Sequence, residues 1–313
     1  MILTVNANAA IDKRYVMGSF ELGEVNRVRS VDMSAGGKGL NVSRAAHIAG
    51  EEVLATGFLG GHAGRFVQEK TQAEGIQDAF VWCDGETRSC INIWDETNRR
   101  QTELLEPGFE VPEDKQEELV KLFAEKIRTC SVATISGSLP KGCTPELYRK
   151  LISAGKAAGK KVILDTSGKT LMEGVHFEPF MIKPNIDEIR QLTGDMVDPD
   201  DKPSLIASAQ KLHALGIPTV VISLGSHGSL MSCEEGAYIA HIPVIDAVNT
   251  VGCGDSMIGG FAVGIARGLA MTECLKLASA VSTAAAMTDK TGYFISSDME
   301  KISRQINIEK ISD

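Results

Sequence analysis

Short apolar runs alternate along the chain with longer segments whose apolar residues recur at helical spacing. The run VVISL at 220–224 is nearly continuous, which is typical of a strand covered on both faces of a parallel sheet. Alternating strands and helices predict parallel strands joined by right-handed crossovers. We therefore predict a three-layer α/β/α fold with a mostly parallel sheet. The predicted strands are residues 2–6, 53–58, 132–135, 162–164, 180–182 and 219–224, and the predicted helices are about 39–49, 62–74, 112–128, 145–158, 203–215, 254–267 and 272–288.

Two segments interrupt this alternation. Residues 87–94 (TRSCINIW) alternate polar and apolar positions, as a half-exposed antiparallel strand would, and a polar turn candidate follows at 95–102. Residues 14–32 carry short extended pieces around Gly18 and Gly23. We expect these regions, about 12–33 and 86–106, to form a small sheet that is either a surface hairpin or a lid. No repeat or linker divides the chain, so residues 1–313 are taken as one domain.

The composition and net charge of the chain argue against some classes of binding partner. The chain has 32 Lys and Arg against 41 Asp and Glu, a net charge of −9, so binding to nucleic acid or to an anionic membrane is not expected. Seven scattered cysteines without a CxxC pair predict reduced thiols. The first residues lack the pattern of a signal peptide, and the apolar run 277–287 is too short to cross a bilayer. We expect a cytoplasmic protein.

Polar and glycine-rich segments follow five of the predicted strands. They are residues 8–12, 136–142, 165–168, 183–188 and 224–228. Loops are commonly rich in glycine, but this does not account as well for the charges of Asp12, Lys183 and Glu188. Since ligands bind beyond the carboxyl ends of strands in open α/β sheets, these segments predict one continuous cleft.

Two glycine-rich segments precede predicted helices. The segment GGKG at 36–39 could bring backbone amides and Lys38 to an anion, although a solvated turn would look the same and the Walker A pattern is absent. In NTVGCGDSM at 249–257, the amides of Gly252, Cys253 and Gly254 could form an anion nest. Asp255 in that segment is either a helix cap or a general base.

In order along the chain, the motifs SAGGKGLNVSR, SGSLPKG, KPNIDE, SLGSHG and NTVGCGDSM resemble those of the PfkB family of sugar kinases, which has a ribokinase-like fold. The segments NAAID, GEVNRV and GETR resemble the hexose-phosphate branch of this family. The resemblance implies transfer of a phosphoryl group from ATP, with Mg²⁺, to a ketohexose phosphate. Tagatose 6-phosphate is the first candidate and fructose 1-phosphate the second. The resemblance also implies a lid and a homodimer formed through it.

The resemblance assigns roles to residues that match the family motifs. The implied sugar-binding residues are Asp12, Gly37, Lys38 and Asn41, and the implied contacts to the phosphate of the substrate are Arg88, Arg27, Ser138 and Lys141. Arg27 and Lys141 could equally be solvated surface charges. The implied nucleotide-binding residues are Lys183, Asn185, Ser223, Gly225 and Gly228. Asn185 and Glu188 should organise Mg²⁺ through water, and Asp165 should help to place the nucleotide or the metal.

The same resemblance makes Gly252, Cys253 and Gly254 the anion hole and Asp255 the catalytic base. Cys253 stands where alanine or serine is common. A helix start can lower the pKa of a thiol, so we expect Cys253 to be open to oxidation or alkylation, and MgATP to protect it.

Three alternatives stay open at this point. A dinucleotide-binding oxidoreductase would need GxGxxG directly after the first strand, which this chain lacks. A non-catalytic sugar-phosphate sensor would have no need for Asp255. A kinase for ribose or a nucleoside would have no need for the charge of Arg88.

Overall fold

The computed structural model describes residues 1–312, and its main sheet has the strand order β15-β14-β13-β12-β11-β10-β9-β1-β4-β5, with β6 also paired to β4. The strands from β12 to β5 run parallel, and β13 to β15 add an antiparallel edge. The bounds are β1 (Ile2–Asn6), β4 (Val53–Leu59), β5 (Gln77–Asp78), β6 (Val81–Trp82), β9 (Val132–Ser136), β10 (Lys161–Asp165), β11 (Met181–Ile182), β12 (Thr219–Ser223), β13 (Ser229–Cys233), β14 (Gly236–His241) and β15 (Asn307–Ser312).

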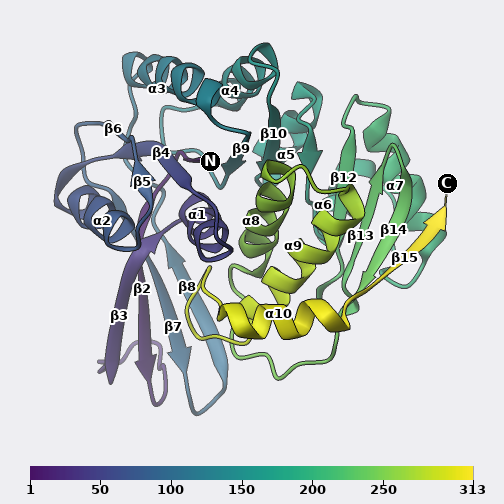
Figure 1. Cartoon of the computed structure of the whole chain (residues 1–313). Helices are drawn as coiled ribbons and strands as arrows, with labels where there is room; N and C mark the ends of the chain where they lie inside the picture. Colours follow the sequence, from purple (N-terminus) through teal and green to yellow (C-terminus); the bar gives the residue numbers. More distant parts are fainter. Residues whose placement is uncertain (313) are drawn as a thin grey trace.

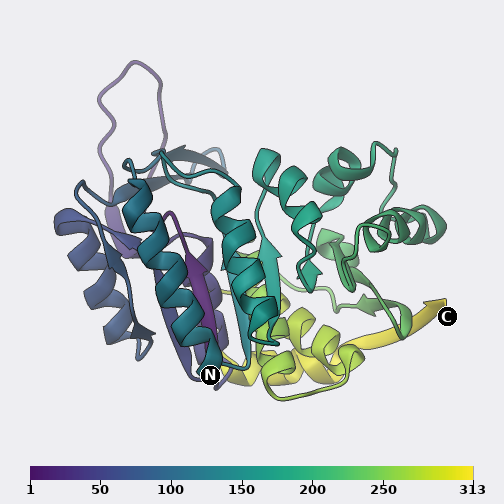
Figure 2. The same ribbon diagram turned by 90° about the horizontal axis from the view of Figure 1, so that it is seen from above.

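Helices cover both faces of this sheet (Figures 1 and 2). One layer holds α1 (Lys38–Ile48), α2 (Gly61–Ala73), α8 (Cys253–Ala266), α9 (Met271–Ala286) and α10 (Ser296–Gln305). The other holds α3 (Glu113–Lys126), α4 (Glu146–Ala157), α5 (Gly168–Gly174), α6 (Ile186–Thr193) and α7 (Lys202–His213). Short 3₁₀ turns lie at η1 (Ile127–Thr129), η2 (Val175–Phe177) and η3 (Gly225–His227).

The alternation of side chains along each strand explains the two cores. On β1, Ile2 packs into the core beneath α1 and α8, whereas Leu3 packs into the core beneath α3 and α4. Val132 and Ala133 of β9 divide in the same way. Because successive residues of a strand point to opposite faces, a run that is apolar throughout fits only a sheet covered on both sides. The predicted three-layer architecture is confirmed.

Helix α8 lies unusually close to its neighbours because its sequence is rich in small residues. A Cβ on Gly260 would lie 2.5 Å from the Cα of Ala278 in α9, and one on Gly259 would lie 2.9 Å from the Cβ of Ala45 in α1. Real Cβ atoms essentially never approach another heavy atom so closely. The glycines therefore allow α8 to pack between α1 and α9, which fixes the position of its N-terminus.

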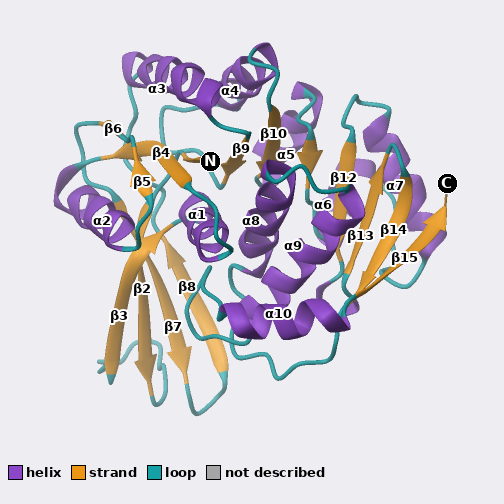
Figure 3. Ribbon diagram, in the orientation of Figure 1, coloured by secondary structure: helices purple, strands orange, loops and turns teal. Residues whose placement is uncertain are grey.

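A separate four-stranded sheet stands beside the main one, at the lower left of Figure 3. Its order is β3 (Ser30–Gly36), β2 (Ala10–Met17), β7 (Arg88–Asp95) and β8 (Arg100–Leu105), and we call it the small sheet. The expected second sheet is present, but its details differ from the prediction. Residues 18–29, where extended pieces were expected, form the exposed loop between β2 and β3. Strand β7 is antiparallel to β8 as expected, yet parallel to β2.

The six predicted strands and seven predicted helices are all found, with ends shifted by one or two residues. The pattern missed α5, α6 and α10, the short strands β5 and β6, and the antiparallel strands at the β15 edge. Within residues 1–312, no helix combines the length and the apolar character that crossing a bilayer requires.

Candidate active site

A cavity of about 1240 Å³ lies where the small sheet meets the carboxyl edge of the main sheet. Its walls come from β2, β7 and β8, from the start of α1, from the loop after β9, and from residues 247–251 and 289–293. Of the residues predicted to bind the sugar, the ones that line it are Asp12, Gly37, Lys38, Arg88 and Ser138. The small sheet is therefore a wall of the cavity rather than a projecting hairpin.

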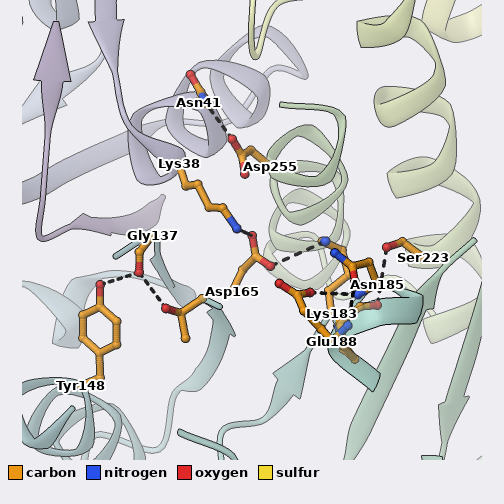
Figure 4. Close-up of polar contacts among 12 residues, drawn as sticks. Lys38, Asn41, Gly137, Tyr148, Asp165, Lys183, Asn185, Glu188, Ser223 and Asp255 are labelled. Carbon is orange, nitrogen blue, oxygen red and sulfur yellow. Dashed lines mark hydrogen bonds and ion pairs between the residues drawn. The ribbon is translucent and has the colours of Figure 1, made fainter. Parts of the chain in front are cut away.

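The remaining predicted residues continue along the same edge of the main sheet. Because β12, β11, β10, β9 and β1 are parallel neighbours, the segments that follow them lie side by side. A bridge joins Asn185, after β11, to Ser223 at the end of β12. Figure 4 shows this group next to Lys183, Asp165 and Lys38. These segments thus form a row of polar groups along the edge, but residues 183–188 and 223–228 do not line the cavity, so the single continuous cleft stays a prediction.

Asp255 lies in the first turn of α8 and is only 6% exposed. Its Oδ2 accepts a hydrogen bond of 2.8 Å from Asn41 Nδ2 (Figure 4). Burial raises the pKa of Asp255 to about 6, against the opposing effects of Lys38, of the Asn41 hydrogen bond and of Lys183. A carboxylate with a pKa near 6 is ionised at neutral pH and can still take up a proton, which are the requirements for a general base.

The backbone around Asp255 is arranged to receive an anion. Gly252 caps α8 with a left-handed backbone (φ 79°), and a Cβ there would lie 2.4 Å from Thr291 Cγ2. Within residues 1–312, the amides of Gly254 and Asp255 have no hydrogen-bond acceptor. The ammonium of Lys183 lies beside Gly254, since a Cβ on that glycine would be 3.1 Å from Nζ. Open amides, a helix N-terminus and an ammonium group together favour negative charge at this point.

Asp165 links two lysines that approach from opposite sides. Its Oδ2 lies 3.9 Å from Lys38 Nζ and its Oδ1 lies 3.6 Å from Lys183 Nζ. Asp165, Asp255 and Glu188 all raise the pKa of Lys38, with Asp165 contributing most. Asp165 is the one of these three carboxylates that forms an ion pair with Lys38 in the described chain. Oδ2 of Asp165 is buried and accepts no hydrogen bond within the described chain.

Asp12 occupies the small-sheet side of the cavity, on β2 beside Gly36 of β3. Burial raises the pKa of Asp12 to about 6, while the charges of Arg44 and Arg88 and the amide of Gly37 act against this rise. The place for this carboxylate depends on Gly36, because a Cβ there would lie 2.0 Å from Asp12 Cγ. Asp12 is thus a half-buried acceptor that can bind hydroxyl groups in the cavity.

Arg88 joins the small sheet to the body of the fold and also faces the cavity. Its Nε and Nη2 donate to the carbonyl of Asn8 at 3.2 and 2.9 Å, and Nη1 donates to the carbonyl of Glu106 at 2.8 Å. A guanidinium has five N–H groups, so two remain for a ligand. Arg88 can therefore bind a phosphate while it holds its own position.

Asn185 and Glu188 form the N-terminal cap of α6. Asn185 Oδ1 accepts from the Glu188 amide at 2.8 Å, and Glu188 Oε2 accepts from the Asn185 amide at 3.0 Å. This arrangement is a capping box, which the sequence analysis did not foresee because α6 was not predicted. It holds both side chains still and leaves Glu188 Oε1 outside the box.

Arg27 and Lys141 do not line the cavity. Arg27 is exposed in the loop between β2 and β3, and Lys141 is exposed in the loop after β9. Neither position supports a contact with the substrate within a single chain, so their phosphate-binding roles stay predictions. The seven cysteines are all free, as expected.

The expectation that the helix start lowers the pKa of Cys253 was wrong, whereas its inactivation by oxidation or alkylation stays a prediction. Burial and the neighbouring charge of Asp255 raise the pKa of Cys253 to about 11, so its thiol is protonated at neutral pH. These two effects outweigh the helix N-terminus, which was expected to lower the pKa. The carbonyl of Asn249 accepts a weak hydrogen bond from Sγ at 3.8 Å.

Three polar residues of this region, Asn6, Asn8 and Arg44, had no individual role in the prediction from sequence. Asn6 and Asn8 line the cavity, and Asn8 Nδ2 donates to Ser138 Oγ at 3.1 Å. Arg44 is buried in α1, where its Nη1 donates to Asn41 Oδ1 at 3.2 Å. The available signal for Arg44 was its spacing: it stands three residues after Asn41, on the same face of a helix whose neighbouring residues are apolar.

The chain is similar in sequence to known carbohydrate kinases. A family model described as pfkB family carbohydrate kinase matches residues 7–297. The tagatose-6-phosphate kinase of Staphylococcus epidermidis (strain RP62A) is 39% identical over 317 residues, covering 99% of this chain and all of that protein. A second strain of the same species, ATCC 12228, has a relative of the same name with the same identity.

Two solved structures share the fold over nearly their whole length. Phosphofructokinase-2 from Escherichia coli, in complex with potassium, has a TM-score of 0.90 and 27% identity, covering 97% of this chain and 98% of that one. A Thermotoga maritima protein described as "Possible 1-phosphofructokinase" has a TM-score of 0.86 and 26% identity, covering 99% of each chain.

Proposed function

Because the chain belongs to the pfkB family of carbohydrate kinases, and is therefore a phosphotransferase with an alcohol group as acceptor, we propose that it converts tagatose 6-phosphate to tagatose 1,6-bisphosphate with ATP. The observation that carries the proposal is the buried carboxylate of Asp255, set beside open amides and two lysines, of which Lys38 also lines the cavity. Full-length identity of 39% to a tagatose-6-phosphate kinase supports this choice of sugar.

In the proposed reaction, Asp255 takes the proton from the primary hydroxyl of the sugar, and the oxygen of that hydroxyl attacks the γ-phosphorus of ATP. The bond from the γ-phosphorus to the bridging oxygen of ADP breaks, and the negative charge on the transferring group meets the amides of Gly254 and Asp255. Lys183 and Lys38 add positive charge on either side of Asp165. Phosphoryl transfer depends mainly on such positioning and charge stabilisation.

The sugar phosphate would lie against the small sheet. Asp12 accepts hydrogen bonds from its hydroxyl groups, and the two remaining N–H groups of Arg88 bind its phosphate as a fork. Arg88 also separates this proposal from a kinase acting on an unphosphorylated sugar. We expect Arg88→Met to remove the preference for a phosphorylated sugar. Arg100→Met should not, since Arg100 pairs with Asp95 at the far end of β7 and does not line the cavity.

When bound, Mg²⁺ would neutralise part of the negative charge on the phosphates of ATP. The donors present suit it, because the buried Oδ2 of Asp165 and the Oε1 of Glu188 are oxygen ligands without a hydrogen bond of their own in residues 1–312. No cluster of three or more His, Cys, Asp or Glu side chains in that part of the chain could hold a metal directly. We therefore propose that Asn185, Glu188 and Asp165 hold the ion partly through water.

We further propose that the protein is a cytoplasmic homodimer joined through the small sheet. Strands β3 and β8 are the two open edges of that sheet, and apolar side chains on them face solvent, among them Val31 (45% exposed) and Leu105 (64% exposed). In the loop between β2 and β3, Leu22 is 89% exposed. Exposed apolar groups beside open strand edges favour association. Light scattering should give a dimer for the native chain and a monomer for Leu22→Asp. A monomeric native chain would exclude the dimer.

The substrate is tested by measuring kcat/KM with MgATP for tagatose 6-phosphate, fructose 1-phosphate and fructose 6-phosphate in parallel. We expect tagatose 6-phosphate to lead by more than about tenfold, or about 1.4 kcal/mol. If fructose 1-phosphate leads instead, the sugar is wrong and the site assignments stand. If none of the three is phosphorylated while ATP still binds, the proposed substrate class fails.

A further inference from the structure

Arg44 forms a buried polar link that ends at Asp255. Its Nε donates to Glu74 Oε2 at 2.9 Å, and its Nη2 donates to the carbonyl of Ala35 at 2.7 Å. Its Nη1 donates to the carbonyl of Thr291 at 3.1 Å and to Asn41 Oδ1 at 3.2 Å. The side chain is 7% exposed. One guanidinium therefore ties α1 to the end of α2, to β3 and to the loop after α9.

This arrangement decides which way the Asn41 amide points. An amide side chain has an acceptor end and a donor end, whereas a guanidinium only donates. Arg44 thus requires Oδ1 of Asn41 on its own side, which turns Nδ2 towards Asp255 Oδ2 at 2.8 Å. With the amide flipped, two acceptor oxygens would face each other.

We propose that Arg44 is a positioning residue for the catalytic base: by fixing the Asn41 amide, it holds Oδ2 of Asp255 and leaves Oδ1 to receive the proton. The inference rests on the proposed function, because it requires Asp255 to be the base. It gives Arg44, which also lines the cavity, a role in the chemical step although none of its hydrogen bonds goes to Asp255.

Three further charged groups face Asp255, namely Lys38 of α1, Asp165 of β10 and Lys183 after β11. Replacing Arg44 leaves all three in place. The Asn41 hydrogen bond lowers the pKa of Asp255, because it favours the charged carboxylate. Loss of a fixed amide should therefore raise the pKa of Asp255 and move the acid limb of kcat to higher pH.

The test compares Arg44→Met with Arg267→Met. Arg267 makes the same kinds of contact beyond the other end of α1, to Glu51 Oε1 at 2.7 Å and to the carbonyl of Ala49 at 2.8 Å. For Arg44→Met we expect kcat to fall about tenfold to a hundredfold, the value of one hydrogen bond to a charged group. The KM for ATP should stay unchanged, and the acid limb should shift upwards. Arg267→Met should change none of these.

Arg44→Lys carries the same test if the Met variant does not fold. It keeps the charge, but an ammonium cannot reach acceptors in four directions, so we expect the same loss and the same shift. Folded Arg44 variants with native kcat and a native acid limb would overturn the inference. So would equal changes in Arg267→Met, which would mark a merely structural effect.

Asp255→Asn, measured in parallel, separates the two proposals. If Asp255→Asn keeps its native kcat, the base assignment in the proposed function is wrong. If Asp255→Asn is inactive while the Arg44 variants behave as the native enzyme, only the role of Arg44 is wrong.

Discussion

The small sheet and the body of the fold each contribute one aspartate, half-buried Asp12 and buried Asp255, and they hold it in different ways. Asp12 lies on β2, where most side chains are half-buried, whereas Asp255 lies in the first turn of α8, where most are fully buried. Burial raises the pKa of each to about 6. At Asp12 the charges of Arg44 and Arg88 oppose the rise in pKa, whereas Asp255 accepts a hydrogen bond from the Asn41 amide. We infer that Asp12 binds the sugar and that Asp255 performs the chemistry.

The largest expected effect is on kcat in Asp255→Asn. Without a base, kcat at saturating substrates should fall by roughly 10²–10⁴, the usual contribution of general base catalysis. The KM for the sugar should change little, because the small sheet is untouched. Steady-state kinetics on protein shown to be folded by circular dichroism checks this. A near-native kcat in Asp255→Asn would show that Asp255 is not the general base.

The same substitution should stabilise the protein at pH 8. The rise in the pKa of Asp255 from 3.8 to about 6 means that the folded state disfavours the charged carboxylate, by roughly 2–3 kcal/mol. This destabilisation of the folded state has its full size well above pH 6, where the carboxylate is charged. It shrinks as the pH falls through 6 and vanishes below about pH 4, where the carboxyl is neutral in both states. Urea unfolding at pH 8 and pH 4.5 should show a gain in the unfolding free energy of Asp255→Asn that is clearly larger at the higher pH. An equal gain at both pH values would contradict this.

Asp12→Asn should act on binding. Loss of a charged acceptor should raise the KM for the sugar phosphate about tenfold to a hundredfold, with kcat at saturation within a few-fold of native. The KM for ATP serves as the internal control and should not change. A fall in kcat as large as that of Asp255→Asn would show that the two aspartates do not have separate roles.

The pH dependence should distinguish the two groups most finely. As the pH falls below 6, kcat should drop about tenfold per pH unit, since only Asp255 must be ionised once the sugar is bound. The value of kcat/KM should drop more steeply, because Asp12 must be ionised as well. Asp12→Asn should reduce the slope of kcat/KM by one and leave that of kcat unchanged. Identical slopes in both enzymes would assign the acid limb to Asp255 alone.

The sequence predicted the part of the fold that depends on burial on both faces of a sheet. Continuous apolar runs such as β12 predict strands covered on both faces, and all six predicted strands are present. The small sheet was harder to predict, because β2 is neither fully buried nor cleanly alternating. Its parallel pairing with β7 joins residues about 80 positions apart, which no local pattern reveals.

The candidate site was predictable where a residue follows a strand or begins a helix. Asp12, Lys38 and Asp255 are found by that rule. Arg44 was not found, because its role depends on Asn41, Glu74 and Thr291 meeting in space. The error at Cys253 has a similar origin: the sequence showed a helix start, but not the burial that raises the pKa of its thiol.

The most direct test of the separation between binding and chemistry is single-turnover transfer from γ-³²P-labelled ATP to tagatose 6-phosphate. The native enzyme, Asp12→Asn and Asp255→Asn would be compared over a range of sugar concentrations. We expect Asp12→Asn to approach the native rate constant at high sugar concentration and Asp255→Asn to stay slow at every concentration. A rate constant for Asp255→Asn that reaches the native value at high sugar concentration would contradict the role of Asp255 as the base.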